Sequence, residues 1–217
     1  MTASRDKSEP RKLPMMPIRD MVIFPYMMTP FVAGRASSVR AIEDALNGDR
    51  KIFLATQHDA SVDAPTTEQI YKVGSICNIV QTVKMTDGDH KGAYKVLVQG
   101  LERAESIDIV LHNGFYMATV LPVVPLPNSN PALNDLMTRV TDLFQHYGKL
   151  HQIPNPEMII ANVRKDNPAM LSDTIAAYLQ LSVEKKQEVL FIFDPMERLE
   201  KIADLMTSNL STSMVSR

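Results

Sequence analysis

Several features common to enzymes, secreted proteins and membrane proteins are absent from this 217-residue sequence. It has one cysteine, which excludes an internal disulfide and fits a reducing compartment. No apolar run approaches the roughly 20 residues that a membrane-spanning helix needs. The net charge is −2 and no stripe of Lys and Arg is visible, which argues against a nucleic-acid surface. The composition therefore predicts a cytoplasmic protein with no membrane partner.

The motifs of common catalytic chemistry are absent too. Gly148-Lys149 is the only Gly-Lys pair, and Leu150 follows it where a phosphate-binding loop needs Ser or Thr for Mg²⁺. No Gly-x-Ser-x-Gly or His-Glu-x-x-His pattern occurs. His146 and His151 would fall on different faces of a helix. We therefore predict no catalytic residue, no metal site and no cofactor in this chain.

One acidic cluster could suggest a cation site. Asp87, Asp89 and His90 gather around Gly88, in the loop from Thr86 to Ala93. Calcium sites need about six or more organised oxygen ligands, so a polar hairpin tip is the better interpretation.

The stretch from residue 13 to residue 30 is dense in proline and methionine. Proline fixes φ and removes a backbone donor, so it is confined to edges, turns and strand starts. The run from Met21 to Phe24 therefore predicts a short strand clamped between turns. Arg19 and Asp20 are expected to form a charge pair at its entrance.

The first half of the chain predicts a β-rich unit. Apolar and alternating segments predict strands at 52–55, 73–85 and 93–99, and a hairpin that pairs 107–111 with 115–120 through Asn113-Gly114. Asp87-Gly88 is a second hairpin signal.

A single helix is expected to interrupt this half. Ser37 or Ser38 would cap it, Val39, Ile42 and Leu46 would share its buried face, and Gly48 would end it. Cys77 lies in an apolar run and is interpreted as a small core residue.

The second half changes to helical periodicity. Four segments place Asn or Asp before Pro, a pattern that supplies an N-cap oxygen and a first helical residue, and Ser182 supplies a further cap. The four pairs are Asn130-Pro131, Asn155-Pro156, Asn167-Pro168 and Asp194-Pro195. We expect about five helices after residue 131.

The last helix carries apolar residues at heptad spacing: Met196, Leu199, Ala203, Met206 and Leu210. Packing within a helical bundle is one explanation. The alternative is the start of a long helix that continues past this sequence. In the present chain we expect this helix to fray after Met206 and to expose Met206 and Leu210 for self-association. Residues 211–217 look more like a cut than a natural end.

These patterns predict four segments. Residues 1–12 are expected to form a disordered leader, 13–121 a β-rich subdomain, 122–130 a proline-rich connector and 131–217 a helical subdomain.

Three blocks of the sequence resemble the N-terminal domain of the Lon family of ATP-dependent proteases. The first block is Leu-Pro, two apolar residues, Pro, an apolar residue and Arg-Asp at 13–20, with Phe-Pro at 24–25 and Pro-Phe-x-x-Gly-Arg at 30–35. The second, at 95–103, resembles a strand-turn-strand signature of the family. The third, at 173–200, resembles its helical part. The loop at 86–93 looks longer than the usual family turn.

The resemblance implies an α+β fold: a small PUA-like β-barrel with one helix, then a helical bundle that ends in a long helix. It implies a substrate-recognition and assembly domain that binds unfolded or damaged proteins, in a family whose full-length members are hexamers. The ATPase and Ser-Lys protease modules of that ATP-dependent serine endopeptidase are absent here, so ATP and Mg²⁺ are expected only for those modules.

Methionine suits surfaces that accept many partners, because it is unbranched and polarizable. We predict that Tyr26, Met27, Met28 and Phe31 bind clients, since turns lie at the surface. Filling of the barrel core is the alternative role for the methionines. A stand-alone cytosolic adaptor and an RNA-binding PUA-like module are alternative functions, although RNA binding needs a basic groove with aromatic platforms.

Overall fold

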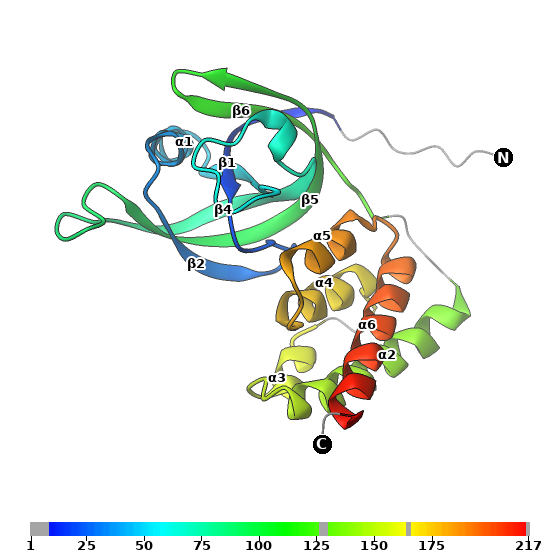
Figure 1. The fold of residues 1–217 in the computed structure, drawn as a ribbon. Helices are drawn as coiled ribbons and strands as arrows, with labels where there is room; N and C mark the ends of the chain where they lie inside the picture. Colours follow the sequence, from blue (N-terminus) through cyan, green and yellow to red (C-terminus); the bar gives the residue numbers. More distant parts are fainter. Residues whose placement is uncertain (1–8, 126–129, 164–165, 216–217) are drawn as a thin grey trace. The chain divides into compact units, whose positions relative to one another are not determined.

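The computed structural model describes residues 9–125, 130–163 and 166–215, with side chains up to residue 210 (Figure 1). The chain divides into two compact units, Met1–Val124 and Pro125–Arg217. This division falls inside the proline-rich segment expected between the two halves. Among the described residues, no helix combines the length and apolar content that crossing a membrane requires.

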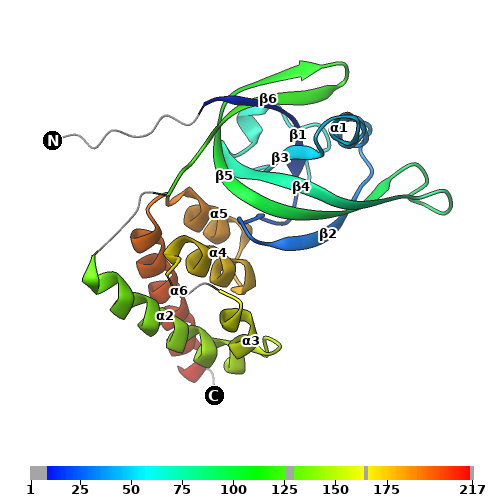
Figure 2. The same ribbon diagram turned by 180° about the vertical axis from the view of Figure 1, so that it is seen from behind.

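The first unit is built on one sheet. Its elements are β1 (Arg11–Ile18), β2 (Met28–Ala33), α1 (Ala36–Asn47), β3 (Lys51–Thr56), a short 3₁₀ helix (Thr67–Gln69), β4 (Val73–Lys84), β5 (Tyr94–His112) and β6 (Phe115–Pro122). The strand order is β2-β5-β4-β3-β1-β6, and β6 also pairs with β5. The pairings from β5 through β4, β3, β1 and β6 thus return to β5. Of the described strands, β2 alone stands outside this ring (Figures 1 and 2).

No strand forms at Met21–Phe24, so that prediction is wrong. The strand in this region is β1, which comes earlier in the chain. The chain leaves the sheet after Ile18, although residues 22–24 are buried. β1 pairs with β6 over its first half and with β3 over its second half. Pro14 and Pro17 therefore each have a neighbouring strand on one side only, where a missing N–H need not break a ladder.

The start of β1 also shortens the expected leader of residues 1–12, because Arg11 and Lys12 belong to the strand. Residues 1–8 of that leader lie outside the described residues.

β5 corrects a second expectation. Residues 95–103 form one continuous strand rather than a strand, a turn and another strand. Gly100 lies in it, and a Cβ at this position would stand 2.2 Å from the Phe24 carbonyl oxygen. The turn at Asn113-Gly114 is confirmed, with both residues at positive φ between β5 and β6.

The early helix begins two to three residues earlier than its expected caps indicate. α1 starts at Ala36 with Arg35 at the N-cap and no side-chain cap, so neither serine caps it, and Ser38 is instead buried. Gly48 ends the helix as predicted. Cys77 is a core residue, and burial raises the pKa of its thiol.

The second unit is helical. Its elements are α2 (Pro131–Leu150), α3 (Pro156–Ala161), α4 (Pro168–Tyr178), α5 (Val183–Phe191) and α6 (Pro195–Val215). Asn130, Asn167, Ser182 and Asp194 accept hydrogen bonds from backbone N–H groups at their helix starts, as predicted. Asn155 does not cap α3, because it adopts a left-handed conformation with φ of 48°.

A buried ion pair joins α4 to α6. Arg198 Nε lies 3.1 Å from Asp173 Oδ1, and both side chains are almost completely buried. Arg198 Nε also donates to Ser172 Oγ, and Nη1 donates to the Ile192 carbonyl at 2.6 Å. The network compensates part of the cost of burying a guanidinium. It connects two parts of the third family-like block that are 25 residues apart.

Packing of the last helix within the bundle is confirmed, whereas the expected fraying and exposure are wrong. α6 continues as a helix to Val215, so it does not end near Met206. Met206 and Leu210 are buried rather than exposed, and α6 packs against α2 and α4. The self-association surface assigned to them rested on their exposure and loses its support.

Candidate functional site

A groove of about 410 Å³ opens on the first unit. One wall is the end of β1 and the residues after it, Met16–Met21, and the other is the end of β2 and the residues after it, Phe31–Arg35. Ser38 of α1 and His90 of the loop between β4 and β5 complete the lining. The groove thus brings together segments that are far apart in the sequence.

The groove reaches the end of β2. Three consecutive residues of this strand, 31–33, line it, although side chains alternate between the two faces of a strand. The groove therefore meets the end of the strand, and residues 28–30 lie outside its lining. β2 pairs with β5 on its other side.

The backbone direction of β2 follows from one hydrogen bond beside it. Gly100 N donates to the Met27 carbonyl at 2.8 Å, and the β2–β5 register continues from this pair. Antiparallel residues alternate between facing the partner and facing away. Met28, Pro30 and Val32 therefore turn their backbone groups to the open edge, where the absent N–H of proline is tolerated.

On the opposite wall, a backbone carbonyl of β1 already has a hydrogen-bond partner. Arg35 Nη2 donates to the Pro17 carbonyl, and Arg35 Nη1 donates to Gln57 Oε1 at 2.9 Å and to the Asp63 carbonyl at 3.2 Å. Arg35 therefore closes the free side of β1 and ties it to the segment after β3. Between the two walls, β2 presents the open backbone edge.

Two guanidinium groups line the groove. Arg19 Nη2 pairs with Asp63 Oδ1 at 2.5 Å, so the expected Arg19–Asp20 pair is wrong. Burial and then the positive charge of Arg19 lower the pKa of Arg35, while the Asp63 carboxylate opposes this. The Asp63 carboxylate thus interacts with both Arg19 and Arg35.

The four residues predicted to bind clients divide into two pairs. Tyr26 and Met28 are exposed, at 43% and 54% of their surface. Met27 and Phe31 are half-buried and pack against the core, and Phe31 also lines the groove.

Tyr26 is held in an unusual backbone conformation. Its φ is 68°, a left-handed value that is rare for bulky residues, and its N–H donates to the Gly100 carbonyl at 2.8 Å. The Gly100 contact fixes this turn while the aromatic ring stays exposed. Strained residues of this kind concentrate at functional sites.

Sequence reasoning missed several residues of this site. Val32 is 49% exposed and shares the outer face of β2 with Met28 and Pro30. Pro30 within this mostly apolar run is a signal that could have identified an edge strand. The partnership of Arg19 with Asp63 had no sequence signal, since 44 residues separate them.

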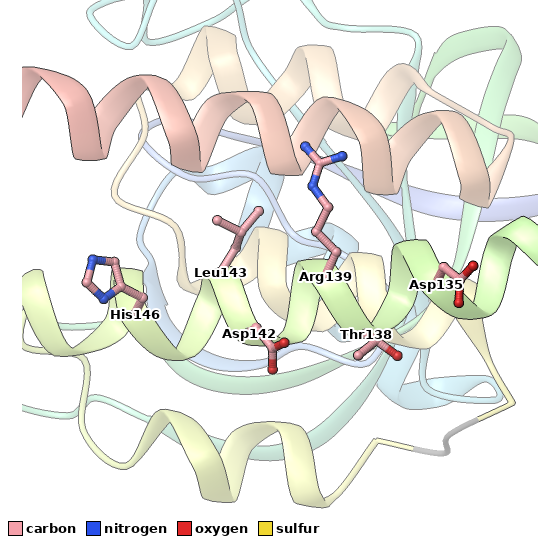
Figure 3. A pocket seen from close by; sticks show the side chains of 6 residues that line it. All are labelled: Asp135, Thr138, Arg139, Asp142, Leu143 and His146. Atoms are coloured by element: carbon pink, nitrogen blue, oxygen red, sulfur yellow. The ribbon is translucent and has the colours of Figure 1, made fainter.

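A second hollow lies on α2 and is lined by Asp135, Thr138, Arg139, Asp142, Leu143 and His146. Arg139 and Leu143 extend toward α6, whereas Thr138 and Asp142 point away (Figure 3). Every lining residue comes from one helix, so the hollow is a shallow surface feature. Within the described part of the chain, no group of three or more His, Cys, Asp or Glu side chains could hold a metal ion.

Comparisons with solved structures show a shared fold. The N-terminal domain of Lon protease from Mycobacterium avium complex superimposes with a TM-score of 0.73 at 18% identity, over 91% of this chain and 98% of that one. The Lon N-terminal domain protein from Xanthomonas campestris gives 0.61 at 15% identity, over 88% and 96%. The α+β combination of a mixed sheet and helices is therefore the fold of Lon N-terminal domains.

Comparisons of sequence reach the same family. Lon protease from Solibacter usitatus is 51% identical over all of this chain, and Lon protease from Escherichia coli K12 is 34% identical over 98% of it. The chain spans about a quarter of the length of these curated relatives, 26% in both cases. The family model of the ATP-dependent protease La (LON) substrate-binding domain matches residues 12–208. The chain therefore belongs to the Lon substrate-binding domain family.

Proposed function

We propose that this chain is the substrate-recognition and assembly domain of a Lon-type ATP-dependent serine protease, and that it binds unfolded or damaged proteins. The observation that carries the proposal is the exposed pair Tyr26 and Met28, which lie just before and at the start of the edge strand β2. Exposed apolar side chains next to an open strand edge suit a disordered chain, whose own backbone and apolar groups are unpaired.

The remainder of the proposal concerns the whole protease. Bound clients pass to ATPase and protease modules outside this chain, which require ATP and Mg²⁺. The protease is a cytoplasmic oligomer, a hexamer. The closed ring of pairings in the first unit supports a PUA-like barrel for that unit. Family membership and the apolar surface at β2 support this role.

The experiment measures binding of a denatured client and stability in the same variants. Replacing Tyr26 and Met28 together by Ser is expected to weaken binding of fluorescein-labelled, reduced and unfolded protein by about tenfold. The thermal midpoint should change little, because both side chains are exposed. Met27→Ser should instead lower the midpoint, since Met27 packs against the core.

Leu111→Ser is the matched control. Leu111 is 69% exposed on the part of β5 that pairs with β6, whereas β2 pairs with residues 94–99 of β5. It tests whether any exposed apolar residue supports binding. Equal losses for Leu111→Ser and for the Tyr26 and Met28 variant, or no loss in either, would contradict the proposed location.

A further inference from the structure

The open edge of β2 offers an incomplete ladder of hydrogen bonds. Met28 and Val32 each turn an N–H and a carbonyl outward, and Pro30 turns a carbonyl outward. Within the described residues, no hydrogen bond from another segment uses these groups. An extended polypeptide laid along the edge would complete the ladder, as in strand-addition complexes.

The far side of the groove offers no second ladder. Its far wall, residues 16–18 of β1, is closed by the hydrogen bond from Arg35 to the Pro17 carbonyl. An added chain can therefore pair on the β2 side while it meets an apolar wall on the other side. Apolar side chains of the added chain would contact Phe31 and Ile18.

Two arginines and one aspartate line the groove. Arg19 and Arg35 repel each other, and Asp63 is the carboxylate that opposes this repulsion. Asp20 also lines the groove, although it forms none of the ion pairs near it. A second carboxylate beside Arg19 would complement the two cations.

We propose that β2 binds a client as an added β-strand, an extended apolar segment with an acidic side chain next to Arg19. The inference rests on the function proposed above and specifies the binding mode. The open edge offers the client two N–H donors, from Met28 and Val32, and three carbonyl acceptors, from Met28, Pro30 and Val32. Pro30 contributes an acceptor only, because it has no backbone N–H. Arg19 recognises the client's acidic residue.

The first test uses peptides that differ only in backbone donors. The probe is an eight-residue fluorescein-labelled peptide of alternating Val and Thr, with one Asp near its end and an amidated C-terminus. In one set of peptides the odd-numbered backbone amides are N-methylated, and in the other set the even-numbered amides are N-methylated. One set should lose about tenfold in affinity and the other should change less than about twofold, because only one series faces β2.

The second test uses charge. Asp63→Asn frees Arg19 from its partner and should strengthen binding of the Asp peptide about threefold, whereas Arg19→Gln should weaken it by a similar factor. Neither variant should affect the same peptide with Asn in place of Asp. A peptide with a free C-terminal carboxylate and no Asp distinguishes recognition of a chain end from recognition of an acidic side chain.

The outcomes separate the two proposals. Equal losses in both N-methyl sets would overturn strand addition, and identical binding of the Asp and Asn peptides would overturn the contact with Arg19. Failure of both the peptides and an unfolded protein to bind would overturn the proposed function itself. Binding of unfolded protein without any effect of N-methylation would leave the function standing and remove the binding mode.

Discussion

The two units of the chain place their charged pairs in different environments. In the second unit, Arg198 and Asp173 are buried together between α4 and α6. In the first unit, Arg19 and Asp63 pair at the surface beside the groove, where Asp63 is 89% exposed. A buried charge must keep its partner, whereas an exposed charge can exchange partners at little cost in free energy. The first arrangement suits structural connection and the second suits recognition.

The largest expected effect comes from breaking the buried pair. Arg198→Met leaves Asp173 buried without its cation and should lower the free energy of unfolding by about 3–5 kcal/mol. Urea denaturation measures the loss of unfolding free energy. Hydrogen exchange measured by mass spectrometry should be faster in α4 and α6. Adding Asp173→Leu should restore a large part of the loss. A loss below about 1 kcal/mol in the single variant would contradict the structural role.

The first unit depends on close backbone packing instead. Gly100→Ala places a Cβ 2.2 Å from the Phe24 carbonyl oxygen and should cost about 1–3 kcal/mol of unfolding free energy. The turn that presents Tyr26 should shift, so client affinity should fall as well. Gly34→Ala is the control, because its Cβ would meet Ala93 at an ordinary 3.6 Å. Equal stability of the two variants would argue against the tight approach at Gly100.

Helix caps give a smaller, local effect in the second unit. Asn167 accepts a hydrogen bond from the Met170 N–H at 2.8 Å, so Asn167→Ala should cost about 1 kcal/mol. Asn155 precedes α3 in a left-handed conformation without capping it, and Asn155→Gly should be neutral or slightly stabilising. Thermal denaturation of both variants tests the distinction. A comparable loss at both sites would show that Asn155 contributes more than its backbone conformation.

The smallest effect is expected at Asp20. This exposed residue forms none of the ion pairs near the groove, so Asp20→Ala should change the unfolding free energy by less than about 0.5 kcal/mol. Asp63→Asn should cost about 0.2–1 kcal/mol, since it removes an exposed partner of Arg19. Chemical denaturation should rank the two in this order. The reverse ranking would restore a structural role for Asp20.

The sequence-based predictions were accurate for features that depend on neighbouring residues and wrong for features that depend on distant ones. Asn113-Gly114, Gly48 and most of the Asn-Pro caps act within a few residues, and the structure confirms them. The strand at Met21–Phe24 and the exposure of Met206 depended on distant partners, and both predictions were wrong. An apolar run is compatible with a strand, a buried loop or a helix face, and only its neighbours decide between them.

The candidate site shows the same division. Tyr26 and Met28 were identified from a turn rich in proline and methionine, and both are exposed. Met27 and Phe31 belong to the same turn and strand but pack against the core. Their neighbours in the sequence are alike, so the difference arises from strand alternation and from the position of the sheet.

The sequence by itself determined the family, the change from strands to helices and the local starts of most helices, because these depend on residues that lie close together in the chain. Tertiary structure alone decided that β2 stays outside the ring of strands, that Arg19 pairs with Asp63 and that Arg198 is buried against Asp173. These contacts join residues 25 to 44 positions apart, or strands across the whole first unit. Local propensity carries no information about such pairings, since burial and hydrogen bonding are satisfied only when the complete fold brings the partners together.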